Sequence, residues 1–207
     1  MFLSLFMIRI LLIRHGDTEL TGRVLYGRMP GVHLSAEGHR QAEALAKSIA
    51  SRYQIEQIVA SPLERAIETA RHLSDAVNLP IATHEGIIEL DYGVWLGQSF
   101  DEIRESSHWE HYNRLRSLLG PPEGELMLEV QTRAWNALRE IMKPYDGTDD
   151  VTLAVVSHGD VIRSLLVLLL GMPLDHLHRL EVSPGSLNEL AFDGHYGRVV
   201  RMNQLPF

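Results

Sequence analysis

No cysteine occurs among the 207 residues of the sequence. This absence excludes disulfide bonds, thiolate-bound metal ions and every mechanism with a cysteine nucleophile, including that of the cysteine-based phosphatases. It does not by itself identify the compartment in which the protein works.

Basic residues are in the minority: 19 Lys and Arg stand against 27 Asp and Glu, which gives a formal net charge of -8 at pH 7. A negative field of this size repels nucleic acid and anionic lipid, so we expect neither nucleic acid nor a membrane as a partner. An anionic small molecule must then be bound by arginines that the fold brings together.

Long hydrophobic runs are also missing. The N-terminal stretch MFLSLFMIRILLI is interrupted by Arg9, is too short to span a bilayer, and has neither a basic start nor a small-residue cleavage site. We therefore expect a cytoplasmic protein. A composition of 45% hydrophobic and 22% charged residues is typical of globular proteins, and we expect a single domain over residues 1–207.

Strand and helix patterns alternate along the chain. Continuous apolar runs predict strands near 7–13, at 56–60, within 79–90 and within 150–160. Apolar residues at three- and four-residue spacing predict helices after Ser35, at 62–77 and at 160–171, and a hairpin is expected at 186–192 and 198–203. This order predicts an α/β protein, a three-layer α/β/α sandwich with a mostly parallel central sheet.

Residues 91–150 differ in character from the rest. Gly93 and Gly97, the segment GPPEGE and a helical pattern from 125 to 143 interrupt the alternation. We expect this stretch to form a small inserted cap over the sheet.

Polar clusters follow four of the predicted strands. They are Arg14-His15-Gly16, Ser61 to Arg65, Glu89, and Ser157-His158-Gly159. Ligands of open α/β sheets bind beyond the carboxyl ends of the strands, so we expect the clusters to meet at one edge. There the two arginines would offer planar forks for the oxygens of a phosphoryl group, and the two histidines would lie beside them.

Each of these residues also has a simpler explanation. His158 and Asp160 could merely begin the next helix, and Arg65 could be a charge on a helix surface. Their coincidence at four strand ends favours the shared site.

His15 is the expected nucleophile of this site. Two cations near an imidazole disfavour its protonation, which leaves a ring nitrogen free to attack phosphorus. Glu89 is the expected proton donor to the leaving alkoxide and later the base for water. Burial beneath the segment of Tyr92 and Trp95 would raise the pKa of Glu89 as this double role requires.

The segments LIRHGDT, LSAEGHRQA, SPLERAIETA, ELDYGVWLG and VVSHGDVIRSLL carry these residues. With them the chain resembles the histidine phosphatase superfamily, also called phosphoglycerate mutase-like, over nearly its full length, and its phosphatase branch in particular. The resemblance implies that His15 becomes phosphorylated, that Arg14, Arg65 and His158 hold the phosphoryl group, and that Glu89 donates the proton. Together with the residues, it indicates a phosphatase of small phosphate monoesters that needs no metal or other cofactor.

Four positions depart from the pattern of that family. Members often carry a phosphate-contacting Asn where Thr21 stands, a Glu where Asp17 stands, a second Glu where Leu96 stands and a Ser where Leu126 stands. Thr21 could still donate its hydroxyl to phosphate, whereas Leu96 cannot take the place of an acid. We therefore expect differences in the outer contacts of the site.

Substrate selection is expected from the loop after the first strand and from the insertion. The candidates are Arg23, Arg28, Tyr92 and Trp95, with Tyr26, His33, Trp109, Arg114 and Arg116 beside them. Ordinary loop and helix surface is the alternative. His108 and His111 are three residues apart, which alone is a weak metal pattern, and we expect no metal site.

Two other functions stay open. A phosphoglycerate-mutase-type transferase would use the same pocket, although family mutases tend to carry a longer insertion than residues 91–150. A non-catalytic module that binds phosphorylated ligands would be expected to lack His15 or Glu89, and both are present. The sequence does not identify the natural substrate and leaves open whether the chain forms a homodimer.

Overall fold

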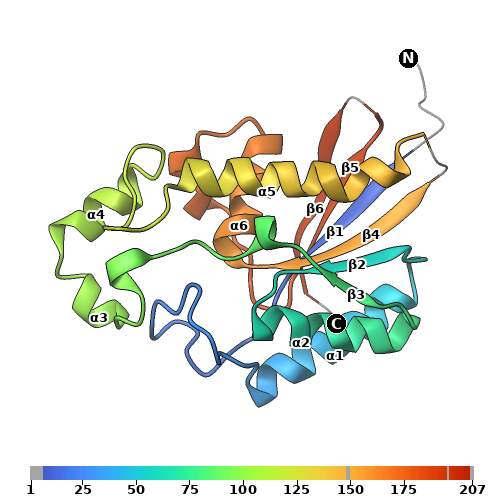
Figure 1. Cartoon of the computed structure of the whole chain (residues 1–207), viewed down its shortest axis with the longest axis horizontal. Helices are drawn as coiled ribbons and strands as arrows, with labels where there is room; N and C mark the ends of the chain where they lie inside the picture. Colours follow the sequence, from blue (N-terminus) through green and yellow to red (C-terminus); the bar gives the residue numbers. More distant parts are fainter. Residues whose placement is uncertain (1–6, 148–149, 195, 206–207) are drawn as a thin grey trace.

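A single mixed sheet organises the chain, described by a computed structural model over residues 7–147, 150–194 and 196–205 (Figure 1). Its six strands lie in the order β3-β2-β4-β1-β5-β6. They span β1 (Ile8–Arg14), β2 (Gln57–Ala60), β3 (Ile81–Thr83), β4 (Val151–Ser157), β5 (Leu187–Phe192) and β6 (Gly197–Gln204). β1 to β4 are parallel, β5 runs antiparallel to β1, and β6 runs antiparallel to β5. The predicted mostly parallel sheet is confirmed.

Helices cover both faces of the sheet, as the predicted sandwich requires. α1 (Ala36–Ala50) and α2 (Glu64–Val77) lie on one face, and α5 (Met127–Met142) and α6 (Gly159–Leu169) lie on the other (Figure 1). Successive side chains of a strand point to opposite faces. Leu11 and Ile13 of β1 therefore pack toward α1 and α2, whereas Ile10 and Leu12 pack toward α5 and α6.

The segment between β3 and α5 holds η1 (Glu85–Ile87), η2 (Gly93–Trp95), α3 (Phe100–Ile103) and α4 (Ser107–Arg114). α3 and α4 stand away from the sheet, at the far left of Figure 1. α5 does not belong with them, because Val130, Ala134 and Leu138 are fully buried in the core that it shares with α6. The part of 91–150 that stands apart from the sheet thus ends before Met127, earlier than expected. Residues 148–149 of that stretch lie outside the described residues.

Parallel pairing brings the ends of three strands to one edge. Arg14 pairs with Ser157, and Ala60 pairs with Val156, so the residues that follow β1, β2 and β4 emerge side by side. The loop after β3 reaches the same edge, because the Ser157 hydroxyl donates to the carbonyl of Ile87 at 2.8 Å. Within the described ranges, no helix has both the length and the apolar character needed to cross a membrane. The N-terminal residues 1–6 lie outside those ranges.

Candidate active site

His15 lies directly after β1 with only 1% of its surface exposed. Its Nδ1 lies 2.7 Å from the carbonyl oxygen of Gly16. A carbonyl can only accept, so Nδ1 carries the proton and Nε2 keeps a free electron pair. Burial, together with the nearby charges of Arg65 and Arg14, holds the pKa of His15 well below its usual range. The imidazole is therefore neutral near pH 7, as a nucleophile requires.

The glycine after His15 is required by close packing. A Cβ atom at Gly16 would lie 2.5 Å from the carbonyl oxygen of Gly38 in α1. A Cβ atom at Gly38 would in turn lie within van der Waals overlap of the Asp17 carbonyl oxygen. These two glycines let the loop that carries His15 rest against the start of α1.

Arg65 enters the site from the first turn of α2 and is completely buried. Its Nε donates to Nε2 of His15 at 3.3 Å, and its Nη2 donates to the Gly27 carbonyl at 2.6 Å. The guanidinium carbon lies 4.8 Å from the centre of the Tyr26 ring. The remaining Nη1 has no hydrogen-bond partner among the described residues. Arg65 is therefore part of the site and not a charge on the surface of α2.

Arg14 and His158 complete the arrangement around His15. Arg14 donates from Nη1 to the Val182 carbonyl at 2.6 Å, while its Nε lacks a partner among the described residues. The His158 ring lies 5.2 Å from the His15 ring, and its Nε2 is hydrogen-bonded to the Ser61 hydroxyl at 2.6 Å. Its Nδ1 also lacks a partner in the described part of the chain. Buried polar nitrogens without partners are costly, so this set is suited to an anionic ligand.

Glu89 follows η1 at the same edge of the sheet. Its Oε1 accepts a hydrogen bond from the backbone N–H of Leu90 at 2.8 Å. Burial raises the pKa of Glu89 to about 7, and the carboxylate of Asp160 adds to the rise, against the opposing charges of Arg65 and Arg14. A carboxyl group with this pKa exchanges its proton near neutrality, which suits an acid that also acts as a base.

A cavity of about 210 Å³ opens beside these groups. Its lining includes Arg14, Thr21, Tyr26 and Glu89. The insertion contributes Phe100, Trp109, Asn113 and Arg116, and the start of α6 and η4 (Leu174–Arg179) contributes Asp160, Arg163 and His178. A larger hollow of about 630 Å³ lies at the opposite end of β1, beside Ile8 and Phe192, far from the paired histidines.

The family model of the histidine phosphatase superfamily, branch 1, matches residues 10–205. The chain belongs to this superfamily. A bifunctional protein of Mycobacterium tuberculosis is 34% identical over 195 residues, which cover 94% of this chain and 53% of that protein, so the chain spans about half of its length. Phosphoserine phosphatase 1 of Hydrogenobacter thermophilus is 27% identical, with 95% of this chain and 92% of that protein covered.

Solved structures of the superfamily share the fold. A mycobacterial glucosyl-3-phosphoglycerate phosphatase superposes with a TM-score of 0.84 at 25% identity, over 95% of this chain and 99% of that chain. The family resemblance expected from the motifs is thus confirmed.

Asp160 organises the outer wall of the superfamily pocket in this chain. Its Oδ2 accepts hydrogen bonds from Arg116 at 2.9 Å and from the Tyr92 hydroxyl at 3.0 Å, and its Oδ1 accepts one from Arg163 at 3.2 Å. Burial alone would raise the pKa of Asp160, but the charges of Arg116 and Arg163 hold it below its usual range. Sequence spacing carried no signal for the long-range pair of Arg116 and Asp160.

Four residues expected to select the substrate line the cavity, namely Tyr26, Tyr92, Trp109 and Arg116. Tyr92 lines it, although its hydroxyl is engaged by Asp160. Thr21, expected to bind phosphate, also lines it, and its hydroxyl accepts from the backbone N–H of Thr18 at 3.0 Å. Arg116, a candidate for substrate selection with ordinary surface as the alternative, is only 2% exposed and lines the cavity.

The other expected selecting residues lie elsewhere. Arg23 is exposed and lies outside the cavity wall. Trp95 is buried in an aromatic cluster, with its ring 5.2 Å from that of Tyr112 and 5.4 Å from that of Trp109, so it stabilises the insertion. Arg28 is held by Glu89 and Glu125 outside the cavity. These three positions lack the contact with the cavity that selection would need.

Histidines of the insertion do not gather with other ligating groups. Nε2 of His108 donates to the carbonyl of Gly120 at 3.0 Å. Among the described residues, no group of three or more His, Asp or Glu side chains is arranged to hold a metal ion.

Proposed function

We propose that the protein is a metal-independent phosphatase that hydrolyses small phosphate monoesters through a phosphohistidine at His15. The observation that carries the proposal is the unprotonated Nε2 of a buried neutral His15, which accepts from Arg65 and lies beside two arginines that each keep an unpartnered nitrogen. Such nitrogens can replace a metal ion in neutralising the phosphoryl oxygens.

In the first step, Nε2 of His15 attacks phosphorus and the bond between phosphorus and the ester oxygen breaks. The leaving alkoxide takes the proton of Glu89, whose pKa of about 7 keeps part of it protonated at neutral pH. Arg14, Arg65 and His158 stabilise the charge on the phosphoryl oxygens.

In the second step, water attacks the phosphorus atom of phosphorylated His15. Glu89, now a carboxylate, takes a proton from this water, and the bond between phosphorus and Nε2 breaks. Inorganic phosphate leaves, and both His15 and Glu89 return to their starting protonation states.

The cavity and the relatives support the proposed substrate class. A volume of about 210 Å³ fits a small leaving group. Two relatives carry the names of phosphoserine and glucosyl-3-phosphoglycerate phosphatases, and both named substrates are phosphate monoesters. A mutase reaction would begin with the same first step and differ only in the acceptor of the phosphoryl group. The cytoplasmic location and the absence of nucleic acid and membrane partners stay predictions, and homodimerisation stays open.

A direct test is phosphate release from a panel of small monoesters in the presence of a chelator, followed by acid quenching and detection of the phosphorylated residue by mass spectrometry. We expect release to continue and the label to be on His15, and we expect His15→Ala to lose both. Label on another residue, or activity that requires added metal, would overturn the proposal.

A further inference from the structure

We propose that Arg28, Glu125 and Arg133, here called the Glu89 clamp, position the proton donor Glu89. The inference rests on the proposed function, because it assigns these residues a role in the same reaction. None of the three lines the active-site cavity. They are therefore positioning residues and make no contact with the substrate.

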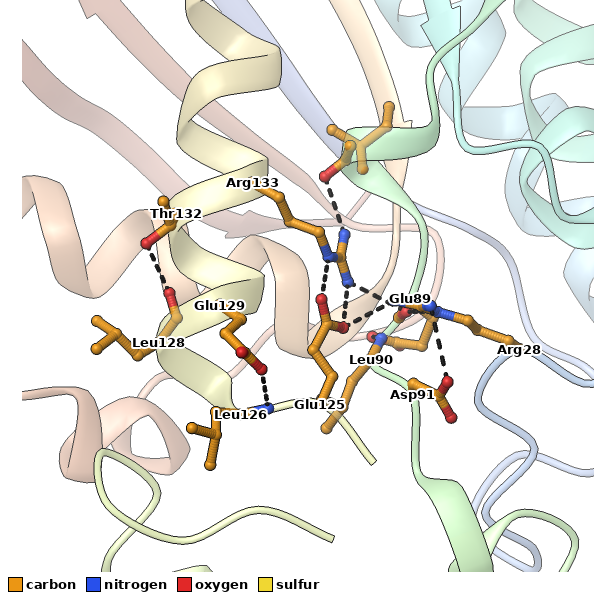
Figure 2. A network of polar contacts seen from close by, with 12 residues as sticks. Arg28, Glu89, Leu90, Asp91, Glu125, Leu126, Leu128, Glu129, Thr132 and Arg133 are labelled. Atoms are coloured by element: carbon orange, nitrogen blue, oxygen red, sulfur yellow. Dashed lines mark hydrogen bonds and ion pairs between the residues drawn. The ribbon is translucent and has the colours of Figure 1, made fainter. Parts of the chain in front are cut away.

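Two guanidinium groups converge on the main chain of Glu89 (Figure 2). Arg28 donates from Nε to the Glu89 carbonyl at 2.7 Å, and Arg133 donates from Nη2 to the same oxygen at 3.2 Å. Arg133 also donates from Nη1 to the Gly86 carbonyl at 2.9 Å. The turn that presents the proton donor is thus held at its start and at Glu89 itself.

Glu125 holds the two arginines together. Its Oε2 accepts from Arg28 at 2.7 Å and from Arg133 at 3.0 Å, and its Oε1 accepts from Nε of Arg133 at 2.7 Å (Figure 2). Two like charges at one carbonyl would repel each other without this carboxylate between them. The side chains of Glu125, Arg133 and Arg28 are 16%, 20% and 31% exposed, so their charges are partly shielded from water.

The orientation of the Glu89 carboxyl depends on this main-chain anchorage. Its hydrogen bond within the described chain is to the backbone N–H of Leu90, the next residue. Consequently the main-chain position determines where the carboxyl lies. A proton donor must reach the leaving oxygen within about 2.6–3.2 Å, so a shift of one ångström would weaken it.

The same loop also anchors the phosphoryl site. Gly27 precedes Arg28, and its carbonyl accepts from Nη2 of Arg65 at 2.6 Å. Two adjacent residues therefore contact the two sides of the site: Gly27 contacts the phosphate-binding arginine through its carbonyl, and Arg28 contacts the main chain of the proton donor through its side chain. We infer that the clamp sets the distance between the phosphoryl group and Glu89.

The test compares substrates that need the proton with substrates that do not. Phenyl phosphate has a basic leaving group that requires protonation, whereas p-nitrophenyl phosphate has an acidic one that departs without it. For Glu125→Gln, we expect kcat/KM to fall by about 10- to 100-fold for phenyl phosphate and by less than about threefold for p-nitrophenyl phosphate. Glu89→Gln should give the same pattern, and Glu89→Gln combined with Glu125→Gln should lose little more than Glu89→Gln alone.

Glu129→Gln is the matched control. Glu129 lies in the same surface hollow as the clamp, but within the described residues its side chain accepts from the backbone N–H of Leu126 alone, at 2.8 Å (Figure 2). Glu129→Gln should leave kcat/KM unchanged for both substrates. Arg133→Lys serves as a second clamp variant, with thermal unfolding to confirm that each protein is folded. The inference would be overturned if kcat/KM fell equally for both substrates, or if it fell in neither of the folded clamp variants.

A separate readout distinguishes this inference from the proposed function. If the unaltered protein hydrolyses neither phosphate, the proposed function fails. The clamp is then tested by carbon NMR of ¹³C-labelled Glu89, assigned with Glu89→Gln. Glu125→Gln should change the chemical shift and the titration midpoint of the Glu89 carboxyl, and an unchanged titration would overturn the clamp.

Discussion

Arg65 donates its Nε–H to Nε2 of His15 across 3.3 Å. On the other side of the ring, Nδ1 of His15 donates to the Gly16 carbonyl at 2.7 Å. The two contacts select one tautomer and direct its electron pair toward a guanidinium that a phosphoryl group would share. Burial, with the charges of Arg65 and Arg14, keeps His15 neutral, and Arg65 lies where a phosphoryl group would bind under the proposed function.

Replacing Arg65 by Ala should therefore affect binding and chemistry together. We expect kcat/KM to fall by about 10²–10³-fold, because a buried donor to the phosphoryl oxygens is lost. Inhibition by vanadate should weaken to a similar extent. Arg71→Ala is the control, since Arg71 is exposed on the same helix and should leave both measurements unchanged. Undiminished vanadate inhibition in the Arg65 variant would contradict the assignment.

The pH profile of kcat/KM should have an alkaline limb near neutral pH, in which activity falls as pH rises. Glu89 has a pKa of about 7 and must be protonated to donate, so kcat/KM for phenyl phosphate should fall above about pH 7. The pKa of His15 lies well below 6.5, so no loss from its protonation is expected between pH 6 and 7. The measurement is a profile corrected for ionisation of the substrate. The alkaline limb should disappear in Glu89→Gln, and its persistence there would assign it to another group.

Glu89 should also make the protein less stable at alkaline pH. Its pKa is raised on folding from 4.5 to about 7, so its stabilising contribution is present below pH 4.5 and is lost as pH rises through 7. Glu89→Gln cannot ionise and should gain about 1–3 kcal/mol over the unaltered protein between pH 5 and pH 8. Urea unfolding at the two pH values measures this. Glu85→Gln, at an exposed position of η1, should give the same difference at both.

Asp160→Asn tests the outer wall of the cavity. The change removes a negative charge that raises the pKa of Glu89, so the alkaline limb of kcat/KM should move to lower pH. It also leaves Arg116 buried without its ionic partner, which should cost about 3 kcal/mol of stability. Asp193→Asn removes a more exposed pair with Arg198 and should cost less than about 1 kcal/mol. A similar loss of stability in the two variants would show that the buried ion pair stabilises the protein no more than the exposed pair does.

The residues of the candidate site could be predicted to lie together because they stand at or after the ends of strands. Arg14 ends β1, and His158 follows β4, so strand pairing alone brings them together. The same reasoning placed Glu89 at this edge. Local hydrophobic pattern and one rule of sheet topology were sufficient for the sheet and for these residues.

The outer site could not be predicted in this way. Arg116 and Asp160 are 44 residues apart, and Arg28 and Glu125 are 97 apart, and both arginines lie in segments for which no periodic pattern was found. An arginine in such a loop has the same local sequence signal whether it contacts substrate, a carboxylate or water. The C-terminal boundary of the insertion was placed too late for a related reason. The helical pattern of α5 predicts a helix but does not indicate whether that helix packs on the sheet or belongs to the insertion.

The distinction between hydrolysis and transfer gives the last prediction. The part of the insertion that stands apart from the sheet lies before Met127 and holds η2 and the short helices α3 and α4. Leu96, where many family members carry a second acid, is 38% exposed and can neither donate nor accept a proton. We expect Glu89 to activate water once the first product has left, and water should reach the phosphohistidine before a second hydroxyl is bound in place.

We therefore expect net phosphate release to exceed isomerisation when the protein is incubated with 3-phosphoglycerate and its bisphosphate primer. Free phosphate and 2-phosphoglycerate would be measured in the same samples, with His15→Ala as the blank for both. Rapid formation of 2-phosphoglycerate with little free phosphate would replace the phosphatase with a mutase. If neither product forms while phenyl phosphate is still hydrolysed, the phosphatase proposal holds and the two phosphoglycerates are not substrates. This outcome is compatible with the proposal because the chemistry at His15 acts on the phosphoryl group, whereas the residues that line the cavity select the rest of the ester.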